Sequence, residues 1–253
     1  LSLVCCKLLC AVAAPHVYEA VTATFTCAGN EFTAKGKTIL TPGWKEIERR
    51  FKASFKTDAD EDAPELAREL PEKNPQLRWK VYNRGINGET TREAKERLES
   101  QVLWLKPHLT VILLGSNDSA LNEGQYRTPW EYEHNMMFIL ERLLAEKHGD
   151  SAFHSGVCLP VLVTPPPVVD TDFYPFTTTD RIETYGEIVK KLAKGYHCPV
   201  IDVYQAFLDI KEAQGFEAYD ALFQFDGVHW SNAGYDVFYA LLEKEILALT
   251  ENF

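Results

Sequence analysis

From residue 65 onward, two kinds of apolar segment alternate along the chain. Short segments that are apolar on both faces, such as 110–114 and 160–163, predict strands of a parallel sheet covered by helices. Longer segments with helical periodicity separate them. The predicted order is helix 65–70, strand 79–86, helix 90–105, strand 109–115, helix 128–147, strand 157–164, helix 180–195, strand 198–204 and helix 231–248. This alternation indicates a three-layer α/β/α sandwich.

The first sixty residues follow a different pattern. Helices are predicted at 1–12 and 42–56, and strands with alternating apolar and polar residues, 22–27 and 31–40, flank a turn at 28–30. The acidic segment 57–64 predicts a linker, because like charges repel and extend a chain. We therefore expect an N-terminal part, residues 1–60, and a main domain, residues 61–253.

The two parts differ in charge. The net charge of the chain is -11; residues 1–56 hold 8 basic and 4 acidic residues, whereas residues 57–253 hold 18 basic and 33 acidic residues. An acidic main domain repels nucleic acids and anionic membrane surfaces. We expect a small-molecule partner and neither nucleic acid nor membrane as a partner. The oligomeric state is left open.

The cysteines favour a reduced protein. The six lie at positions 5, 6, 10, 27, 158 and 198, without the spacing of a disulfide framework and without a C-x-x-C pair. We expect buried thiols and a cytoplasmic protein. The apolar segment 1–14 resembles the core of a secretory signal, but Lys7 lies inside it, so secretion is the less favoured alternative.

Two candidate residues follow predicted strands, where a doubly wound sheet places its binding site. Gly88 follows strand 79–86, and its missing side chain lets a backbone N–H approach a developing oxyanion; the alternative is a simple turn glycine. Asn117 follows strand 109–115, and its side-chain amide can donate to the same oxyanion. The alternative for Asn117 is a capping or Asx-turn residue.

Asp226 and His229 form the sharpest candidate pair. They lie three residues apart in a predicted loop that enters the last helix, so both side chains can turn to one side. The carboxylate can then hold one imidazole nitrogen while the other nitrogen accepts a proton from a hydroxyl group. The alternative is an acidic residue at a helix start beside a surface histidine. Gly227 between them and the following segment 230–234 strengthen the catalytic interpretation.

These residues carry a resemblance to a known family. The segments 83–90 (NRGINGET), 113–118 (LLGSND) and 226–229 (DGVH), in this order, resemble three sequence blocks of the SGNH hydrolases, also called GDSL esterases. The segments 164–167 (TPPP) and 222–229 are similar to the branch that contains isoamyl-acetate-hydrolysing esterases. The resemblance covers about residues 65–253. It implies a flavodoxin-like fold and ester hydrolysis by a serine nucleophile, without metal or cofactor.

The same resemblance implies a role for each candidate residue. His229 would be the general base and Asp226 would orient it, while Gly88 and Asn117 would build the oxyanion hole. The family also begins with a buried strand that ends in Gly-Asp-Ser and supplies the nucleophile, and this tripeptide does not occur in the chain. We therefore expect the first strand of the sheet to be missing or replaced by the N-terminal part.

No serine is a secure replacement for this nucleophile. Ser54 lies 34 residues before Gly88, a separation that the family's geometry accepts. The preceding segment 46–52 is too charged for a central parallel strand, so a serine at a helix end is the alternative interpretation. Ser116, Ser119 and Ser231 are better explained as turn or capping residues. The nucleophile stays unassigned, with Ser54 as a weak candidate.

The N-terminal part has a resemblance of its own. Residues 1–60 resemble a stretch of bacterial type IA topoisomerases of the topoisomerase III kind, through the segments 3–9, 15–20, 22–27, 31–40 and 43–47. Such enzymes need a tyrosine nucleophile and an acidic Mg²⁺ site. No matching motif is present, since Tyr18 stands in the wrong context. We interpret this part as a structural appendage.

Three functions follow from these observations. The first is a serine-type ester hydrolase, a carboxylesterase or acetylesterase that acts on small acyl esters and is impaired by loss of the nucleophile block. The second is a catalytically inactive protein of SGNH fold that binds a ligand, or the product of a gene junction. The third, a DNA-binding topoisomerase fragment, is disfavoured by the negative charge of the main domain.

Overall fold

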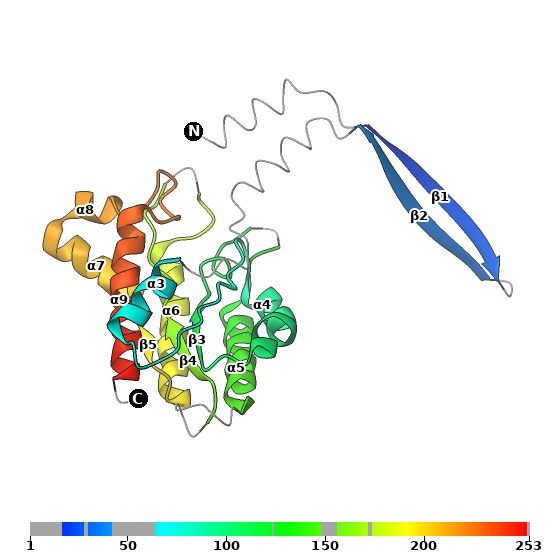
Figure 1. Ribbon diagram of the computed structural model, residues 1–253. Helices are drawn as coiled ribbons and strands as arrows, with labels where there is room; N and C mark the ends of the chain where they lie inside the picture. Colours follow the sequence, from blue (N-terminus) through cyan, green and yellow to red (C-terminus); the bar gives the residue numbers. More distant parts are fainter. Residues whose placement is uncertain are drawn as a thin grey trace. The chain divides into compact units, whose positions relative to one another are not determined.

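The computed structural model describes residues 17–27, 30–41, 64–122, 124–147, 156–171 and 174–251. The chain divides into two compact units, Leu1–Glu61 and Asp62–Phe253. In the first unit, β1 (Val17–Cys27) and β2 (Asn30–Thr41) pair as the antiparallel hairpin seen in Figure 1. Both strands are longer than predicted. The predicted helices 1–12 and 42–56, with Ser54, lie outside the described residues.

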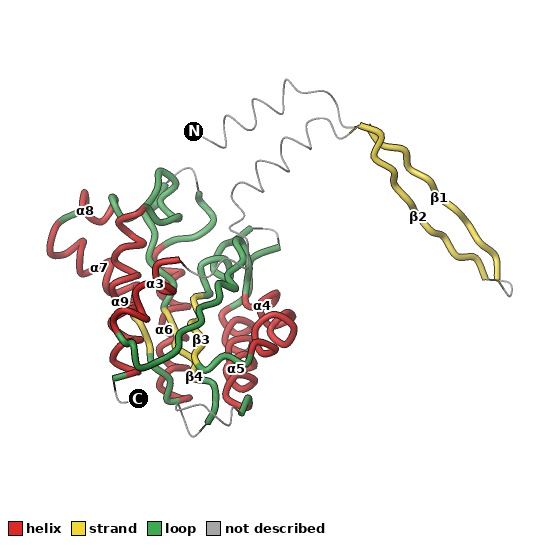
Figure 2. Tube along the Cα trace, in the orientation of Figure 1, coloured by secondary structure: helices red, strands yellow, loops and turns green. Residues whose placement is uncertain are grey.

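The second unit contains a parallel sheet. Its strands are β3 (Leu109–Leu113), β4 (Leu159–Val163) and β5 (Val200–Ile201), in the order β3-β4-β5. Figure 2 shows these strands surrounded by helices. Every residue of β4 is buried, whereas in β3 only Ile112 is fully buried. In the described sheet, β4 is therefore the central strand and β3 lies at an edge.

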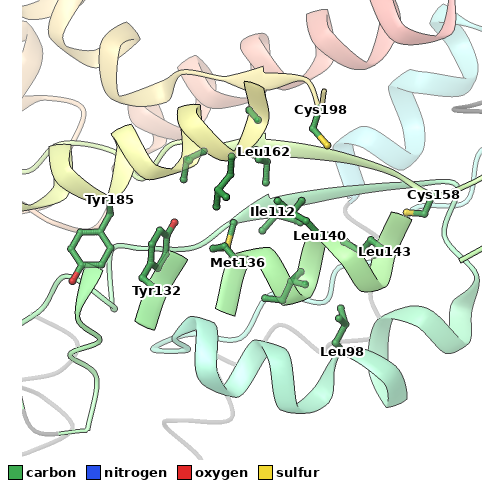
Figure 3. Packing of buried hydrophobic residues seen from close by; sticks show 14 of the residues in the cluster. Leu98, Ile112, Tyr132, Met136, Leu140, Leu143, Cys158, Leu162, Tyr185 and Cys198 are labelled. Atoms are coloured by element: carbon green, nitrogen blue, oxygen red, sulfur yellow. The ribbon is translucent and has the colours of Figure 1, made fainter. Parts of the chain in front are cut away.

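Successive side chains of the strands face opposite helix layers, as the pleat of a strand requires. Ile112 and Leu162 pack into one apolar cluster with α4 (Thr91–Arg97), α5 (Pro129–Ala145) and α6 (Thr179–Tyr196), shown in Figure 3. Val161 and Val163 pack into the other cluster, with α3 (Pro64–Lys73), α7 (Val203–Gln214), α8 (Phe216–Asp220) and α9 (Asn232–Thr250). The predicted three-layer α/β/α fold with a parallel sheet is confirmed.

The predicted strand 79–86 is wrong: these residues have no regular secondary structure. Trp79 and Val81 nevertheless pack at the margin of the cluster that contains β4 and α9. A strand needs a neighbour for its backbone hydrogen bonds. In the flavodoxin-like strand order 2-1-3-4-5, the second strand pairs only with the first. The tripeptide Gly-Asp-Ser does not occur in the chain, and among the described residues segment 79–86 has apolar contacts but no neighbouring strand.

Two other elements differ from their predicted form. The predicted helix 90–105 is α4 followed by a π-helical turn, Leu98–Val102, and a 3₁₀ turn, Leu103–Leu105. Leu98 and Leu103 are both buried, and the wider turn brings these residues, five apart, to the same side. The predicted strand 198–204 is only Val200–Ile201, because Asp202 already caps α7 through the amide of Gln205 at 3.1 Å. Helices α7 and α8 were not predicted.

Candidate active site

Asp226 and His229 lie in the loop between α8 and α9, and their side chains meet. The Nδ1 atom of His229 is 2.6 Å from Oδ2 of Asp226. The other carboxylate oxygen accepts hydrogen bonds from the backbone amides of Val228, at 3.0 Å, and His229, at 2.9 Å. These bonds orient both oxygens of the carboxylate. The sequence motif therefore folds into a carboxylate–imidazole pair.

The electrostatics of Asp226 favour its ionised form. Partial burial pushes the pKa of this carboxyl upward, but the bonds from the Val228 amide, the His229 imidazole and the His229 amide outweigh burial and hold the pKa below its usual value. The His229 side chain is 69% exposed, compared with 18% for Asp226. The imidazole of His229 is therefore open to solvent, while its Nδ1 atom is held by the oriented carboxylate of Asp226.

Gly227 allows the loop of this pair to lie against the connection between β4 and α6. Its φ is +73°, and a Cβ atom placed on it would lie 2.2 Å from the carbonyl oxygen of Val169. The Val169 amide donates to the carbonyl of Gly227 at 2.8 Å, and the Thr171 hydroxyl donates to the carbonyl of Asp226 at 2.8 Å. Only glycine tolerates both the backbone conformation and the close approach.

Gly88 and Asn117 also lie close together. The side-chain nitrogen of Asn117 donates to the carbonyl oxygen of Glu89, the residue after Gly88, at 3.0 Å. Gly88 is exposed and has a φ of +79°. Within the described part of the chain, its backbone N–H has no hydrogen-bond acceptor. A side-chain amide and a free backbone N–H are the donor types that stabilise an oxyanion.

The connection between β4 and α6 touches both halves of the site. At its start, Val169 and Thr171 bind the loop of Asp226. Near its end, the carbonyl of Phe176 accepts the Leu121 amide at 2.7 Å, and the Thr177 hydroxyl lies 2.8 Å from that of Ser119, two residues beyond Asn117. One connection therefore joins the two loops at the carboxyl edge of the sheet. That the four predicted residues form one site stays a prediction.

Among the described residues, the serine hydroxyls either bind other groups or form no hydrogen bond with His229. Ser119 is buried and donates to the carbonyl of Ser116 at 2.8 Å, and Ser231 caps α9 and donates to the carbonyl of Ala221 at 2.6 Å. Their predicted turn and capping roles are confirmed by these contacts. Among the described residues, no serine hydroxyl hydrogen-bonds to Nε2 of His229. Ser54 cannot be placed, since it lies outside those residues.

Three supporting contacts were not predicted. The buried carboxylate of Glu89 forms a bidentate ion pair with the guanidinium group of Arg97. The same guanidinium group donates to the carbonyl of Arg84 at 2.7 Å. The buried carboxylate of Asp118 accepts the amide of Thr91 at 3.0 Å. Gln125 contacts both Gly88 and Asn117. Glu89 and Asp118 stand inside the motif segments, but their partners lie on α4, which only the fold brings near.

The described side chains include no group of three or more histidine, cysteine, aspartate or glutamate residues able to hold a metal ion. Over the same part of the chain, none of the helices has both the length and the apolar character that a membrane crossing requires.

Comparison with known proteins identifies the family. The model of the GDSL-like lipase/acylhydrolase family matches residues 29–237, more than half of the chain, and the protein belongs to this family. The fold and family are those of ester hydrolases. The matched range begins within the first structural unit.

Relatives with described activities agree with this assignment. An acetylxylan esterase of Geobacillus stearothermophilus is 28% identical over 177 residues, which are 68% of this chain and 74% of that protein. A lipase/acylhydrolase structure from Enterococcus faecalis gives a TM-score of 0.59 at 25% identity and covers 74% of this chain and 89% of that chain. The structure of the Geobacillus acetylxylan esterase gives a TM-score of 0.57 at 25% identity, covering 70% of this chain and 76% of that chain.

Proposed function

We propose that this protein hydrolyses small acyl esters, such as acetyl esters, with His229 as general base and with water in place of the missing serine. The observation that carries the proposal is the 2.6 Å contact between His229 and Asp226 in a loop tied to the Asn117 loop by one connection. The solved acetylxylan esterase relatives include catalytic mutants at a serine, an aspartate and a histidine. Their aspartate and histidine have the same separation as Asp226 and His229.

The proposed reaction follows from the donors and acceptors of the site. Asp226 accepts the Nδ1 hydrogen of His229, which leaves Nε2 as the proton acceptor. A water molecule gives a proton to Nε2 as its oxygen bonds to the acyl carbon. The carbonyl oxygen becomes an oxyanion that the Gly88 amide and the Asn117 side chain stabilise. The C–O bond to the alcohol then breaks, and His229 returns the proton to the leaving oxygen.

Water attack makes the reaction slow. A nucleophilic serine splits acyl transfer into two easier steps and is held by a rigid strand, whereas a water molecule must be held by hydrogen bonds alone. We therefore expect turnover of p-nitrophenyl acetate well below the range of about 1 to 1000 per second that is usual for enzymes. Replacing His229 by alanine should abolish this turnover, and Ser54→Ala and Ser116→Ala should not change it.

The serine variants distinguish the proposal from an intact triad. Turnover within the usual enzyme range that disappears in Ser54→Ala, while the fold persists, would make Ser54 the nucleophile. Loss in Ser116→Ala would assign that serine instead. Equal turnover in the unchanged protein and His229→Ala would refute catalysis by the Asp226–His229 pair. Circular dichroism of each variant provides the control for folding.

A second candidate function is that of an inactive protein that binds an ester or its alcohol. The absence of Gly-Asp-Ser favours it, since the family's nucleophile comes from that tripeptide. Saturation-transfer NMR with an acetylated sugar would show binding without hydrolysis if this alternative holds.

The resemblance of residues 1–60 to topoisomerase III and the cytoplasmic location stay predictions. We propose these residues as an appendage, which predicts no salt-sensitive binding to single-stranded DNA.

A further inference from the structure

Gln125 lies in the loop between Asn117 and α5 and contacts both proposed oxyanion donors. Its side-chain nitrogen is 3.1 Å from the carbonyl oxygen of Gly88 and 3.1 Å from Oδ1 of Asn117. The side-chain oxygen of Gln125 accepts a hydrogen bond from the side-chain nitrogen of Asn122. The loop returns to the Asn117 turn where the Arg127 amide donates to the carbonyl of Asp118 at 2.9 Å.

Two backbone carbonyls set the orientation of both amides. A carbonyl oxygen only accepts hydrogen bonds, so the Gln125 atom that faces Gly88 O must be the nitrogen. This nitrogen also faces Asn117, so the Asn117 atom opposite it must be the oxygen. The nitrogen of Asn117 then faces the carbonyl of Glu89, as observed at 3.0 Å. The hydrogen-bond network is consistent in only this orientation.

We propose that Gln125 is a positioning residue for ester hydrolysis, because it binds Gly88 and Asn117 together and directs the free amide hydrogen of Asn117 to the oxyanion. One hydrogen of the Asn117 amide is used by Glu89 O, and the second is available. Without Gln125, the Asn117 amide can rotate and present its oxygen to the reaction site, where it would repel the oxyanion. The catalytic consequence rests on the proposed function, whereas the positioning does not.

The positioning is tested without any activity measurement. Gln125→Met keeps the length of the side chain but removes the donor, and Gln125→Glu replaces the donor by an acceptor. In either variant, we expect the side-chain amide signals of Asn117 in ¹H–¹⁵N spectra to shift and their hydrogen exchange to become about tenfold faster, the factor for one ordinary hydrogen bond. Gln205→Met is the matched control, because Gln205 is exposed on α7 and its side chain donates to Asp209 at 2.7 Å, away from Asn117.

The kinetic test uses p-nitrophenyl acetate. We expect Gln125→Met to lower kcat by about 10- to 100-fold with KM unchanged, because the oxyanion forms only in the transition state. A raised KM with unchanged kcat would overturn the catalytic role. Unchanged Asn117 signals in both Gln125 variants would overturn the positioning. Altered Asn117 signals together with no His229-dependent turnover in the unchanged protein would leave the positioning intact and refute the proposed function.

Discussion

The backbone of Val169 touches that of Gly227 so closely that a Cβ atom on Gly227 would lie 2.2 Å from the Val169 carbonyl oxygen. The Val169 amide also donates to the Gly227 carbonyl at 2.8 Å. This contact joins the connection after the central strand to the loop that carries Asp226 and His229. The position of the Asp226–His229 pair therefore depends on a residue without a side chain.

We expect Gly227→Ala to lower the free energy of unfolding by about 2 to 6 kcal/mol, the sum of backbone strain and overpacking. Urea denaturation measures this loss. The matched control is Gly215→Ala, since Gly215 has a φ of +89° but open space around its Cβ position. The control should lose only about 1 to 3 kcal/mol. Equal losses in the two variants would contradict the role of the Val169 contact.

A second prediction concerns the ion pair beneath Gly88. The Glu89 side chain is only 5% exposed and the Arg97 side chain 15%. Arg97→Met leaves a buried carboxylate without its partner, so we expect a loss of about 3 to 5 kcal/mol in the free energy of unfolding. Replacing Glu89 by leucine in the same chain removes the unpaired charge and should recover most of the loss. A loss below about 1 kcal/mol for Arg97→Met would show that water already solvates Glu89.

Asp118 should make stability depend on pH. Burial raises its pKa to about 6, against hydrogen bonds from Thr91 that favour the ionised form. The folded protein therefore holds the Asp118 proton more tightly than the unfolded chain, whose reference pKa is 3.8. The stability from this group is fully present below pH 3.8 and is lost as the pH rises through about 6.

The measurement compares the unchanged protein with Asp118→Asn, which does not titrate. Between pH 4 and pH 7, the free energy of unfolding of the unchanged protein should fall by about 2 kcal/mol relative to that of Asp118→Asn. Other groups contribute equally to both proteins and cancel. In particular, the lowered pKa of Asp226 contributes stability that is lost as the pH falls, the opposite direction. A difference that stays constant over this pH range would contradict the burial argument.

Hydrogen exchange should distinguish segment 79–86 from the sheet. Leu162 and Thr164 are buried, and their backbone amides donate to the carbonyls of Pro199 at 2.9 Å and Ile201 at 3.0 Å. Among the described residues, the amides of Val81 and Tyr82 donate no backbone hydrogen bond. We expect Val81 and Tyr82 to exchange orders of magnitude faster than Leu162. Comparable protection would mean that another strand pairs with this segment in solution.

Activity should also depend on Asp226. Asp226→Asn keeps the shape of the side chain but presents an amide to Nδ1 of His229, which favours the wrong tautomer for proton acceptance at Nε2. Intact triads lose about 10⁴ in kcat on this change. We expect the His229-dependent turnover of p-nitrophenyl acetate to fall to the rate of His229→Ala. Retained turnover would show that Asp226 does not orient the base.

The sequence by itself determined the layers and the loops of the candidate site. Segments 110–114 and 160–163 are short, apolar on both faces and rich in valine, isoleucine and leucine, a pattern typical of strands covered by helices, so β3 and β4 were predictable. The helical periodicity of α5, α6 and α9 is equally local. Asp226 and His229 are three residues apart, so a single loop brings their side chains into contact. Such features depend on neighbours along the chain.

Tertiary structure decided the rest. Segment 79–86 has the composition of a strand, but a strand forms only where another backbone supplies hydrogen bonds, and that depends on a distant part of the chain. Gln125 carries no sequence signal, since its importance comes from two carbonyl and amide groups that the fold places beside it. The contacts of Glu89 with Arg97 and of Gly227 with Val169 have the same origin. Arg97 reaches Glu89 from α4, and Val169 reaches Gly227 from the connection after β4, so both contacts depend on how the helices and loops pack around the sheet.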